Sequence, residues 1–184
     1  WDWQAKQIVY PESLVGSGEL AFHPNDRQLL FLCGESLRII DIPTRQVVSQ
    51  APNRFRYRNG AFSPDGKLLA ITSLYATATI VDAATWETVA TVPEAGPTDS
   101  VAWNSVEPYL VFGTSNSRLY LWDYVKRTGH FLFSDWIGGI FHLAFSPDGR
   151  MLASNGGDNV FHLRTMDGDK VDWRTPGRVL RFSR

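Results

Sequence analysis

The sequence predicts an all-β fold made of four-stranded antiparallel units that repeat about every 40 residues. The first observation is a recurring aromatic residue, spaced by 40, 41 and 42 positions: Phe22, Phe62, Trp103 and Phe145. The second is a recurring aspartate, spaced by 41 positions each time: Asp41, Asp82 and Asp123. Two series with nearly the same period indicate that one supersecondary unit is repeated along the chain.

Each recurring aromatic ends the first strand of a unit and is followed by a turn. Residues 62–66 and 145–149 both read Phe-Ser-Pro-Asp-Gly, and residues 22–26 read Phe-His-Pro-Asn-Asp. The segment at 103–107 is a degenerate version, Trp-Asn-Ser-Val-Glu. Glycine at the end of such a turn can adopt the positive φ that a hairpin needs. We therefore expect each turn to lead into an apolar second strand: 29–32, 68–71, 109–112 and 151–153.

The third strand is clearest at residues 119–123, which alternate with a period of two. Bulky side chains project from both faces, which indicates that both faces are covered by neighbouring sheets. We expect Trp122 and the alternate apolar residues of the third strands to be buried between units: Ile39, Ile80, Leu121 and Phe161. Short fourth strands are expected at 46–49, 87–92, 130–133 and 170–173, with connections such as 93–99 between units.

A single four-stranded unit cannot bury both of its faces, whereas units stacked around an axis can. The period, the strand order, the Phe-Ser-Pro-Asp-Gly turns and Trp122-Asp123 resemble the WD-repeat β-propeller family. The resemblance implies a β-propeller of four-stranded antiparallel blades. The family's Gly-His dipeptide ahead of each blade is absent here, and only residues 1–2 and 122–123 keep the Trp-Asp pair. Its buried His–Asp–Ser/Thr–Trp network is therefore incomplete, and the blades must depend more on apolar packing.

The repeat divides the chain into four complete blades with partial blades at both ends. The expected boundaries are a partial blade at 1–12, blades at about 17–52, 57–95, 99–136 and 139–174, and the start of a next blade at 178–184. The two ends together lack a second strand, so joining them would leave unpaired sheet edges. We expect part of a longer propeller, with further blades from a longer chain. The alternative is a self-contained five-fold arrangement with one defective blade.

Composition limits the classes of partner and the compartment. The net charge of −1 argues against electrostatic attraction to nucleic acid or to an anionic membrane. No apolar run is long enough to span a bilayer. The single cysteine, Cys33, cannot form an intrachain disulfide and fits a small buried strand residue, so nothing indicates an oxidising compartment. We expect an intracellular, cytoplasmic protein.

The residue types that usually carry catalysis form no recognisable motif. The chain has no phosphate-binding loop, no metalloprotease helix motif and no Gly-x-Ser-x-Gly elbow. His142 and His162 share a blade but lie on different strands, with no second His or Cys at ligand spacing. Residues 155–159 fit a tight turn better than a loop of oxygen ligands. We expect no enzyme activity, no cofactor and no metal.

Arginine alternates with aromatic residues between the first two complete blades. In an extended segment Arg54, Arg56 and Arg58 would project from one face and Phe55 and Tyr57 from the other. The family resemblance places this connection beside the central channel, where partners commonly dock. Such a ridge could hold an acidic peptide, a phosphate or nucleic acid. The alternative is a solvated connection whose arginines pair with nearby carboxylates.

Further candidates lie at equivalent places in the other blades. Asp99 and Phe141 stand at the beginnings of first strands, where a site at the channel mouth would be built. Trp136 and Trp173 lie in connections, where a Trp is either a lid over a blade edge or an exposed binding anchor. Arg178 follows the last complete blade. We predict these residues to be partner-binding candidates.

The leading functional hypothesis is a non-catalytic scaffold that presents loops around the channel mouth to a protein or peptide partner, which the arginine ridge would make acidic. This rests on the family resemblance, because a fold alone does not fix a function. One alternative is a propeller enzyme whose site at the channel mouth is shared with blades outside the chain. Another is a sensor domain of a larger signalling protein.

Overall fold

All regular structure in the described part of the chain is β-strand. The computed structural model describes residues 18–33, 36–52, 57–73, 75–132, 138–166 and 173–176. The first sheet has four antiparallel strands: β1 (Gly18–Phe22), β2 (Gln28–Cys33), β3 (Ser36–Asp41) and β4 (Gln46–Pro52). The last sheet has four more: β12 (Ile140–Phe145), β13 (Met151–Gly156), β14 (Val160–Thr165) and β15 (Trp173–Pro176).

The middle sheet has seven strands because one long strand joins two repeat units. Its members are β5 (Tyr57–Phe62), β6 (Leu68–Ser73), β7 (Thr77–Asp82), β8 (Thr88–Trp103), β9 (Tyr109–Thr114), β10 (Leu119–Asp123) and β11 (Thr128–Phe131). The first part of β8 pairs with β7, and from Thr98 onward β8 pairs with β9. The connection expected at 93–99 is therefore wrong, since these residues continue the strand. Pro93 and Pro97 favour extended backbone in themselves and in the residues before them.

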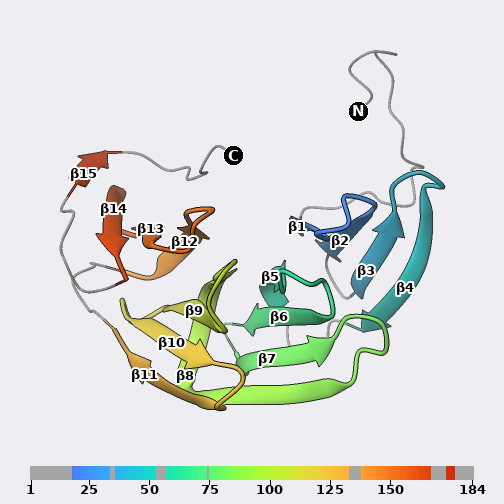
Figure 1. The fold of residues 1–184 in the computed structure, drawn as a ribbon, viewed down its shortest axis with the longest axis horizontal. Helices are drawn as coiled ribbons and strands as arrows, with labels where there is room; N and C mark the ends of the chain where they lie inside the picture. Colours follow the sequence, from blue (N-terminus) through green and yellow to red (C-terminus); the bar gives the residue numbers. More distant parts are fainter. Residues whose placement is uncertain are drawn as a thin grey trace.

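The sheets are arranged in an arc around a common centre (Figure 1). Successive first strands contact one another across the sheets: β1 contacts β5, β5 contacts β8, and β8 contacts β12. These strands therefore line the inner side of the arc. The described sheets do not close into a ring. The predicted fold class, an all-β protein of antiparallel four-stranded sheets of the propeller type, is confirmed.

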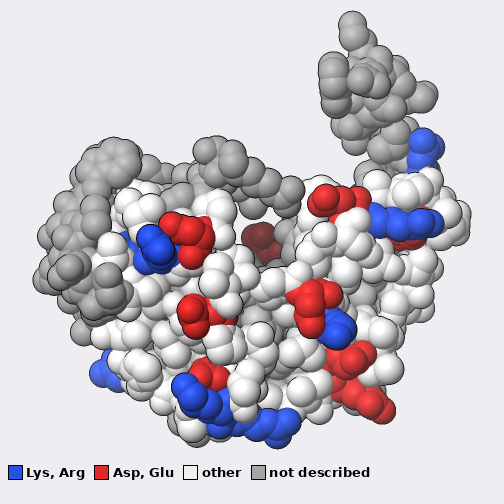
Figure 2. Space-filling view, viewed as in Figure 1, with Lys and Arg blue, Asp and Glu red and all other residues white. Residues whose placement is uncertain are grey.

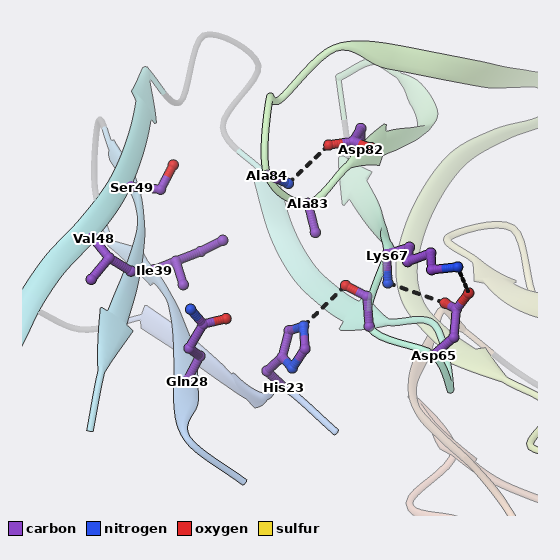
Figure 3. A pocket seen from close by; sticks show the side chains of 11 residues that line it. His23, Gln28, Ile39, Val48, Ser49, Asp65, Lys67, Asp82, Ala83 and Ala84 are labelled. Atoms are coloured by element: carbon purple, nitrogen blue, oxygen red, sulfur yellow. Dashed lines mark hydrogen bonds and ion pairs between the residues drawn. The ribbon is translucent and has the colours of Figure 1, made fainter. Parts of the chain in front are cut away.

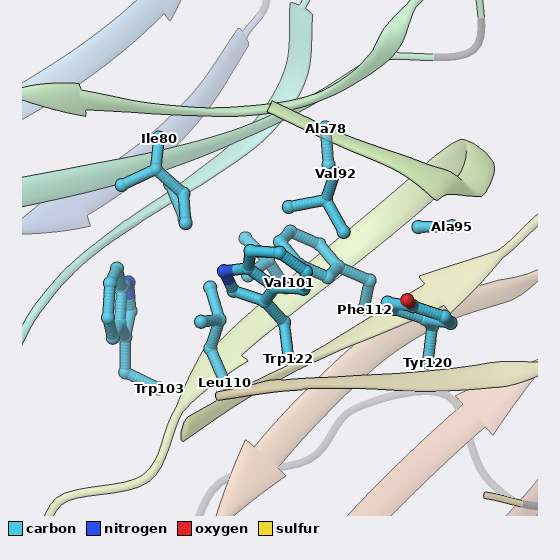
Figure 4. Packing of buried hydrophobic residues seen from close by; sticks show 11 residues of the cluster. Ala78, Ile80, Val92, Ala95, Val101, Trp103, Leu110, Phe112, Tyr120 and Trp122 are labelled. Atoms are coloured by element: carbon cyan, nitrogen blue, oxygen red, sulfur yellow. The ribbon is translucent and has the colours of Figure 1, made fainter. Parts of the chain in front are cut away.

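The core lies between the sheets and follows one repeated rule. Leu30 and Ile39 of the first sheet pack against Leu69 and Val81 of the next unit. One unit further on, the equivalent face carries Ala70 and Ile80 and packs against a cluster that includes Leu110, Phe112, Tyr120 and Trp122 (Figure 4). Each fully buried side chain of this size contributes about 1.5–3 kcal/mol by leaving water. Contacts between units thus stabilise the arc.

The burial expected in the third strands is confirmed for three residues and wrong for two. Ile39, Ile80 and Trp122 are 3%, 1% and 7% exposed. Leu121 is only half-buried, because it packs at the margin of the smaller cluster between the third and fourth units. Phe161 is also half-buried, since it projects from the face of β14 opposite to the one that packs on the preceding unit. Burial in this fold depends on a neighbouring unit as well as on strand period.

The first unit shows the same dependence. Phe22 occupies the position of Phe62 in the next unit, and each pairs with a leucine near the start of a second strand, Leu29 or Leu69. Phe62 is 8% exposed and packs against the preceding sheet, whereas Phe22 is 69% exposed. Among the described residues no sheet covers Phe22 in the way that the first sheet covers Phe62. The recurring aromatic is therefore buried only where a preceding blade stands beside it.

The recurring aspartates organise the turns after the third strands. The Oδ1 atoms of Asp41, Asp82 and Asp123 accept hydrogen bonds from backbone N–H groups three residues later, at 2.8, 2.9 and 2.9 Å. Hydrogen bonds to a carboxylate favour its charged form, and the pKa of each of these groups lies below its ordinary value. The 41-residue spacing of the aspartates is thus the spacing of a repeated turn.

Candidate functional site

Three of the four inner strands contain a β-bulge at the same position. The pairing register of each strand skips one residue, which is Arg58 in β5, Asp99 in β8 and Phe141 in β12. Each skipped residue lies four positions before the aromatic that ends its strand: Phe62, Trp103 or Phe145. The pairing of β1 with β2 has no such shift. A bulge changes the direction of the extra side chain and interrupts the ladder, and bulges are common beside functional sites.

The three bulge residues form one surface at the entrance to the inner side of the arc. We call Arg58, Asp99 and Phe141 the bulge surface. Their strands are neighbours, since β5 contacts β8 and β8 contacts β12. Arg58 is exposed, Phe141 is 46% exposed and Asp99 is 9% exposed. The surface therefore combines an exposed cation, an accessible aromatic ring and a largely buried carboxylate.

Hydrogen bonds between two blades hold the surroundings of Asp99 in place. The backbone N–H of Ser115 donates to the carbonyl oxygen of Pro97 at 3.2 Å, and the hydroxyl of Ser117 donates to that of Gly138 at 2.7 Å. The buried hydroxyl of Ser100 donates to the carbonyl oxygen of Ile140 at 2.7 Å. These bonds join β8, the β9–β10 turn and β12. The bulge surface is thus supported by a framework that spans the third and fourth blades.

Asp99 lies in an unusual electrostatic position. Burial raises the pKa of its carboxyl group, and the nearby positive charge of Arg58 opposes this shift. No described residue donates a hydrogen bond to the carboxylate of Asp99 or forms an ion pair with it within 4 Å. Gly139 lies directly beside it: a Cβ at position 139 would stand 2.8 Å from Oδ2 of Asp99 and 3.0 Å from Cε1 of Phe141. Any side chain larger than that of glycine at position 139 would therefore crowd the carboxylate and the ring.

The structure describes only part of the set of residues predicted from sequence. Arg58, Asp99 and Phe141 are brought together as the bulge surface. Trp173 begins β15, where only the backbone is described. The remaining candidates lie outside the described residues: Arg54, Arg56, Trp136 and Arg178. The arginine ridge therefore stays a prediction, with Arg58 as its one described member.

Sequence reasoning missed the residues that shape the recess around Asp99. These are Gly139, which provides the space, and the serines that fix the surrounding backbone: Ser100, Ser115 and Ser117. One signal was available, because Arg58, Asp99 and Phe141 share a position when the repeats are aligned on their aromatic residues. The serines gave no signal, since Ser100 and Ser117 bond to residues at the start of the next blade and Ser115 to a residue 18 positions earlier in the chain.

The opposite ends of the strands carry grooves between blades. One groove, with a volume of about 540 Å³, lies between the first and second units and is lined by His23, Gln28, Val48, Ser49, Asp65 and Lys67, among others (Figure 3). His23 Nε2 lies 3.0 Å from the carbonyl oxygen of Gly66, and Lys67 lies beside Asp65. The polar groups that line this groove are thus partly engaged with one another, which makes it a weaker candidate than the bulge surface.

Charge and metal-ligand patterns give no competing site in the described part of the chain. Basic and acidic side chains lie in small mixed groups on the face shown in Figure 2, without a large field of one sign. No three His, Cys, Asp or Glu residues come together within the described ranges in a way that could hold a metal ion. His162 Nε2 lies 3.0 Å from Oδ2 of Asp158, within one turn of the last sheet. No helix long and apolar enough for a membrane span occurs among these residues either.

The fold and the site define a class of protein, an all-β propeller-type protein with a polar and aromatic surface at one end of its inner strands. The family model for the WD domain, G-beta repeat, matches residues 125–163, which run from the turn after β10 into β14. Together with the four-stranded sheets, this match and the relatives described next show that the chain is similar to WD-repeat proteins.

Two curated relatives are serine-threonine kinase receptor-associated proteins. The one from Gallus gallus is 27% identical over 167 residues, which cover 87% of this chain and 45% of the relative. The one from Mus musculus is 24% identical over 144 residues, which cover 76% of this chain and 39% of the relative. The chain therefore spans less than half the length of these relatives. Relatives of this kind are in general protein-interaction scaffolds.

Proposed function

We propose that the chain is a non-catalytic interaction scaffold that presents its bulge surface to a peptide or protein partner. The observation that carries this proposal is the repeated bulge, which places Arg58, Asp99 and Phe141 at one level of three adjacent strands. Bulges interrupt strand pairing and weaken a sheet locally, so three at one position favour a role beyond folding. A cation, a carboxylate and an aromatic ring are groups that recognise polypeptides.

The support for a binding role over an enzyme is chemical. Asp99 is the one ionisable acid of the bulge surface, and Arg58 and Phe141 can neither accept a proton from a substrate at neutral pH nor attack it. A general acid–base pair or an activated nucleophile would need a second titratable group beside Asp99. The bulge surface is therefore better suited to hold a partner than to transform one. We further propose an intracellular location, which the single Cys33 permits.

The test is partner capture with two matched triple variants. The first, Arg58→Gln with Asp99→Asn and Phe141→Ala, removes the bulge surface. The second, Lys67→Gln with Glu87→Gln and Val106→Ala, makes the same kinds of change at exposed residues near the opposite ends of the strands. Both variants should melt within a few degrees of the parent. Chemical cross-linking in cell extract, read by mass spectrometry, should give partners that the second variant keeps and the first variant loses.

The relatives supply a first partner to test. Their name describes association with a serine-threonine kinase receptor, so a receptor of this class is a concrete probe for this chain. If the bulge-surface variant and the parent capture the same proteins in equal amounts, the bulge surface is not the docking site and the proposal is wrong. Loss of every partner from both variants would likewise contradict it, because binding would then not be localised to one end of the strands.

A further inference from the structure

The strongest unexplained feature of the molecule is the carboxylate of Asp99. The residue is about nine-tenths buried, and no other described residue hydrogen-bonds to its carboxylate. Buried carboxylates are normally paired or hydrogen-bonded, because removing their charge from water is costly. Asp99 nevertheless keeps 9% of its surface exposed. Within the described part of the chain its carboxylate therefore has unused capacity to accept hydrogen bonds.

The neighbours of Asp99 restrict what could enter. Oδ2 of Asp99 and Cε1 of Phe141 both lie close to Gly139, since a Cβ at this position would stand 2.8 Å from the oxygen and 3.0 Å from the ring carbon. Phe141 has almost half of its surface exposed, so its ring can contact an incoming group. A carboxylate next to an aromatic ring suits a flat cation, which can donate hydrogen bonds to the oxygens and stack on the ring.

We propose that the recess formed by Asp99, Phe141 and Gly139 binds the guanidinium group of an arginine on the partner polypeptide. This inference rests on the proposed function and names the chemistry of its partner. Guanidinium is favoured over ammonium because it is planar, more weakly hydrated and able to donate two parallel hydrogen bonds to a carboxylate. The serine hydrogen bonds that join β8, the β9–β10 turn and β12 fix the backbone around Asp99 before binding.

Arg58 would compete with the incoming arginine for the carboxylate of Asp99. Its positive charge already acts on Asp99, although no ion pair forms within 4 Å. Removing this charge should therefore strengthen binding of a cationic peptide and weaken binding of an acidic one. The two kinds of partner thus respond to a change at Arg58 in opposite directions, which separates an arginine-bearing partner from the acidic partner that the ridge predicts.

The test is an NMR titration of the isotope-labelled full chain with four acetylated pentapeptides, each with one central residue between glycines. The central residues are arginine, citrulline, lysine and glutamate. Citrulline keeps the shape of arginine without its charge. The arginine peptide should shift the amide signals of Ser115 and Gly139 and bind about tenfold or more tightly than the citrulline peptide. The affinity of the lysine peptide should lie between those of the arginine and citrulline peptides.

Three variants and one control complete the experiment. Asp99→Asn should lower the affinity for the arginine peptide by about tenfold or more, whereas Arg58→Gln should raise this affinity severalfold. Gly139→Ala should weaken it by filling the recess, and its backbone amide pattern shows whether the fold is kept. Glu87→Gln, which removes the same charge from an exposed turn between β7 and β8, should leave the affinity unchanged.

Each other outcome overturns the inference. Equal binding of arginine and citrulline, or an unchanged affinity in Asp99→Asn, would show that the carboxylate does not recognise a cation. Preference for the glutamate peptide, lost in Arg58→Gln, would show that the surface selects acidic partners, and the proposed function would then stand without this inference. Absence of binding by all four peptides would also overturn it, while the cross-linking experiment would still decide the proposed function.

Discussion

The side-chain amide of Asn104 donates a hydrogen bond to the carbonyl oxygen of Gly149 at 2.8 Å, across the boundary between the third and fourth blades. Two units earlier, His23 makes the equivalent contact with Gly66 at 3.0 Å. In both cases the residue after a first strand reaches the glycine that ends the next blade's turn. Gly66 and Gly149 have φ values of +74° and +71°, a backbone conformation that favours glycine. The turns therefore link blades as well as strands.

Asn104→Ala should destabilise the protein by about 2 kcal/mol or more. Asn104 is 1% exposed, and its Oδ1 accepts backbone N–H bonds from Val106 and Glu107 at 2.9 and 2.8 Å. Alanine would leave these donors and the Gly149 carbonyl without their partner inside the protein. Urea unfolding measures the loss. Asn25→Ala is the control, because exposed Asn25 makes similar turn bonds in the first blade and should cost under about 1 kcal/mol. Equal losses would mean that the link between blades contributes nothing.

Phe62→Ala should lower the free energy of unfolding by about 3–5 kcal/mol, and Phe22→Ala should lower it by under about 1 kcal/mol. The two residues occupy the same position in successive blades, but Phe62 is 8% exposed and Phe22 is 69% exposed. The difference measures what a preceding blade adds to the burial of the recurring aromatic. Thermal and urea unfolding of the two variants provide the comparison. A large loss for Phe22→Ala would show that its ring is covered in solution.

The strands could be predicted from the sequence because their signals are local and repeated. The two series of aromatic and aspartate residues place first and third strands within a few residues of their observed positions. Continuation of β8 through residues 93–99 could not be predicted in this way, since the prolines in this segment are residues typical of turns and connections. The half-burial of Phe161 also escaped prediction, because it depends on which faces are covered by a neighbouring sheet rather than on the strand itself.

The candidate site was predictable as a set of residues but not as an arrangement. Arg58, Asp99 and Phe141 have suitable chemistry and share a position in the repeat. The bulge that changes the direction of these side chains is a register shift in the pairing with the next strand, which the sequence of one strand does not show. The burial of Asp99 depends on residues from another blade, such as Gly139. A recessed carboxylate is therefore a property of the assembled blades.

Acid should destabilise the protein partly through Asp41. The guanidinium of Arg27 donates to this carboxylate at 2.8 Å, and with the turn bonds it lowers the pKa of Asp41 to about 2. In the unfolded chain the pKa is about 3.9, so the folded state binds fewer protons between these values. The stabilising contribution is thus complete above about pH 4 and is lost as the pH falls through about 2.

Arg27→Gln tests this contribution, because it removes the donor and leaves the carboxylate in place. The variant should lose stability at pH 6, and its stability should fall less steeply than that of the parent between pH 4 and pH 2. Urea unfolding over this pH range gives both curves. Parallel curves would indicate that the Arg27–Asp41 pair does not contribute to acid sensitivity.

Trp122→Ala should lower the free energy of unfolding by about 3–5 kcal/mol, and Trp122→Phe should lower it much less. Trp122 is 7% exposed within the cluster of Figure 4. Its Nε1 is buried without a hydrogen-bond partner, which agrees with the incomplete hydrogen-bond network expected from the sequence. Phenylalanine keeps most of the packing and removes the unpaired N–H. Urea unfolding measures both variants, with Val125→Ala, at 69% exposure, as a control that should change stability by under about 0.5 kcal/mol.

Asp99→Asn should stabilise the folded protein at neutral pH. Burial raises the pKa of the Asp99 carboxyl above its ordinary value, so the folded state disfavours the charged form more than the unfolded chain does. The resulting penalty is absent below the unfolded pKa and grows as the pH rises through the folded pKa. The amide of asparagine carries no charge, so the variant should melt at a higher temperature than the parent at pH 7 and at the same temperature near pH 3.

This last comparison separates a binding role for Asp99 from a structural one. A carboxylate kept at a cost to stability fits a group whose partner is supplied by another molecule. Glu87→Gln controls for the change in net charge and should leave the melting temperature unchanged at both pH values, because Glu87 is exposed. A lower melting temperature for Asp99→Asn at pH 7 would mean that the carboxylate stabilises the framework between the third and fourth blades. Asp99 would then be a structural residue, and the proposed binding of an arginine beside Phe141 would be wrong.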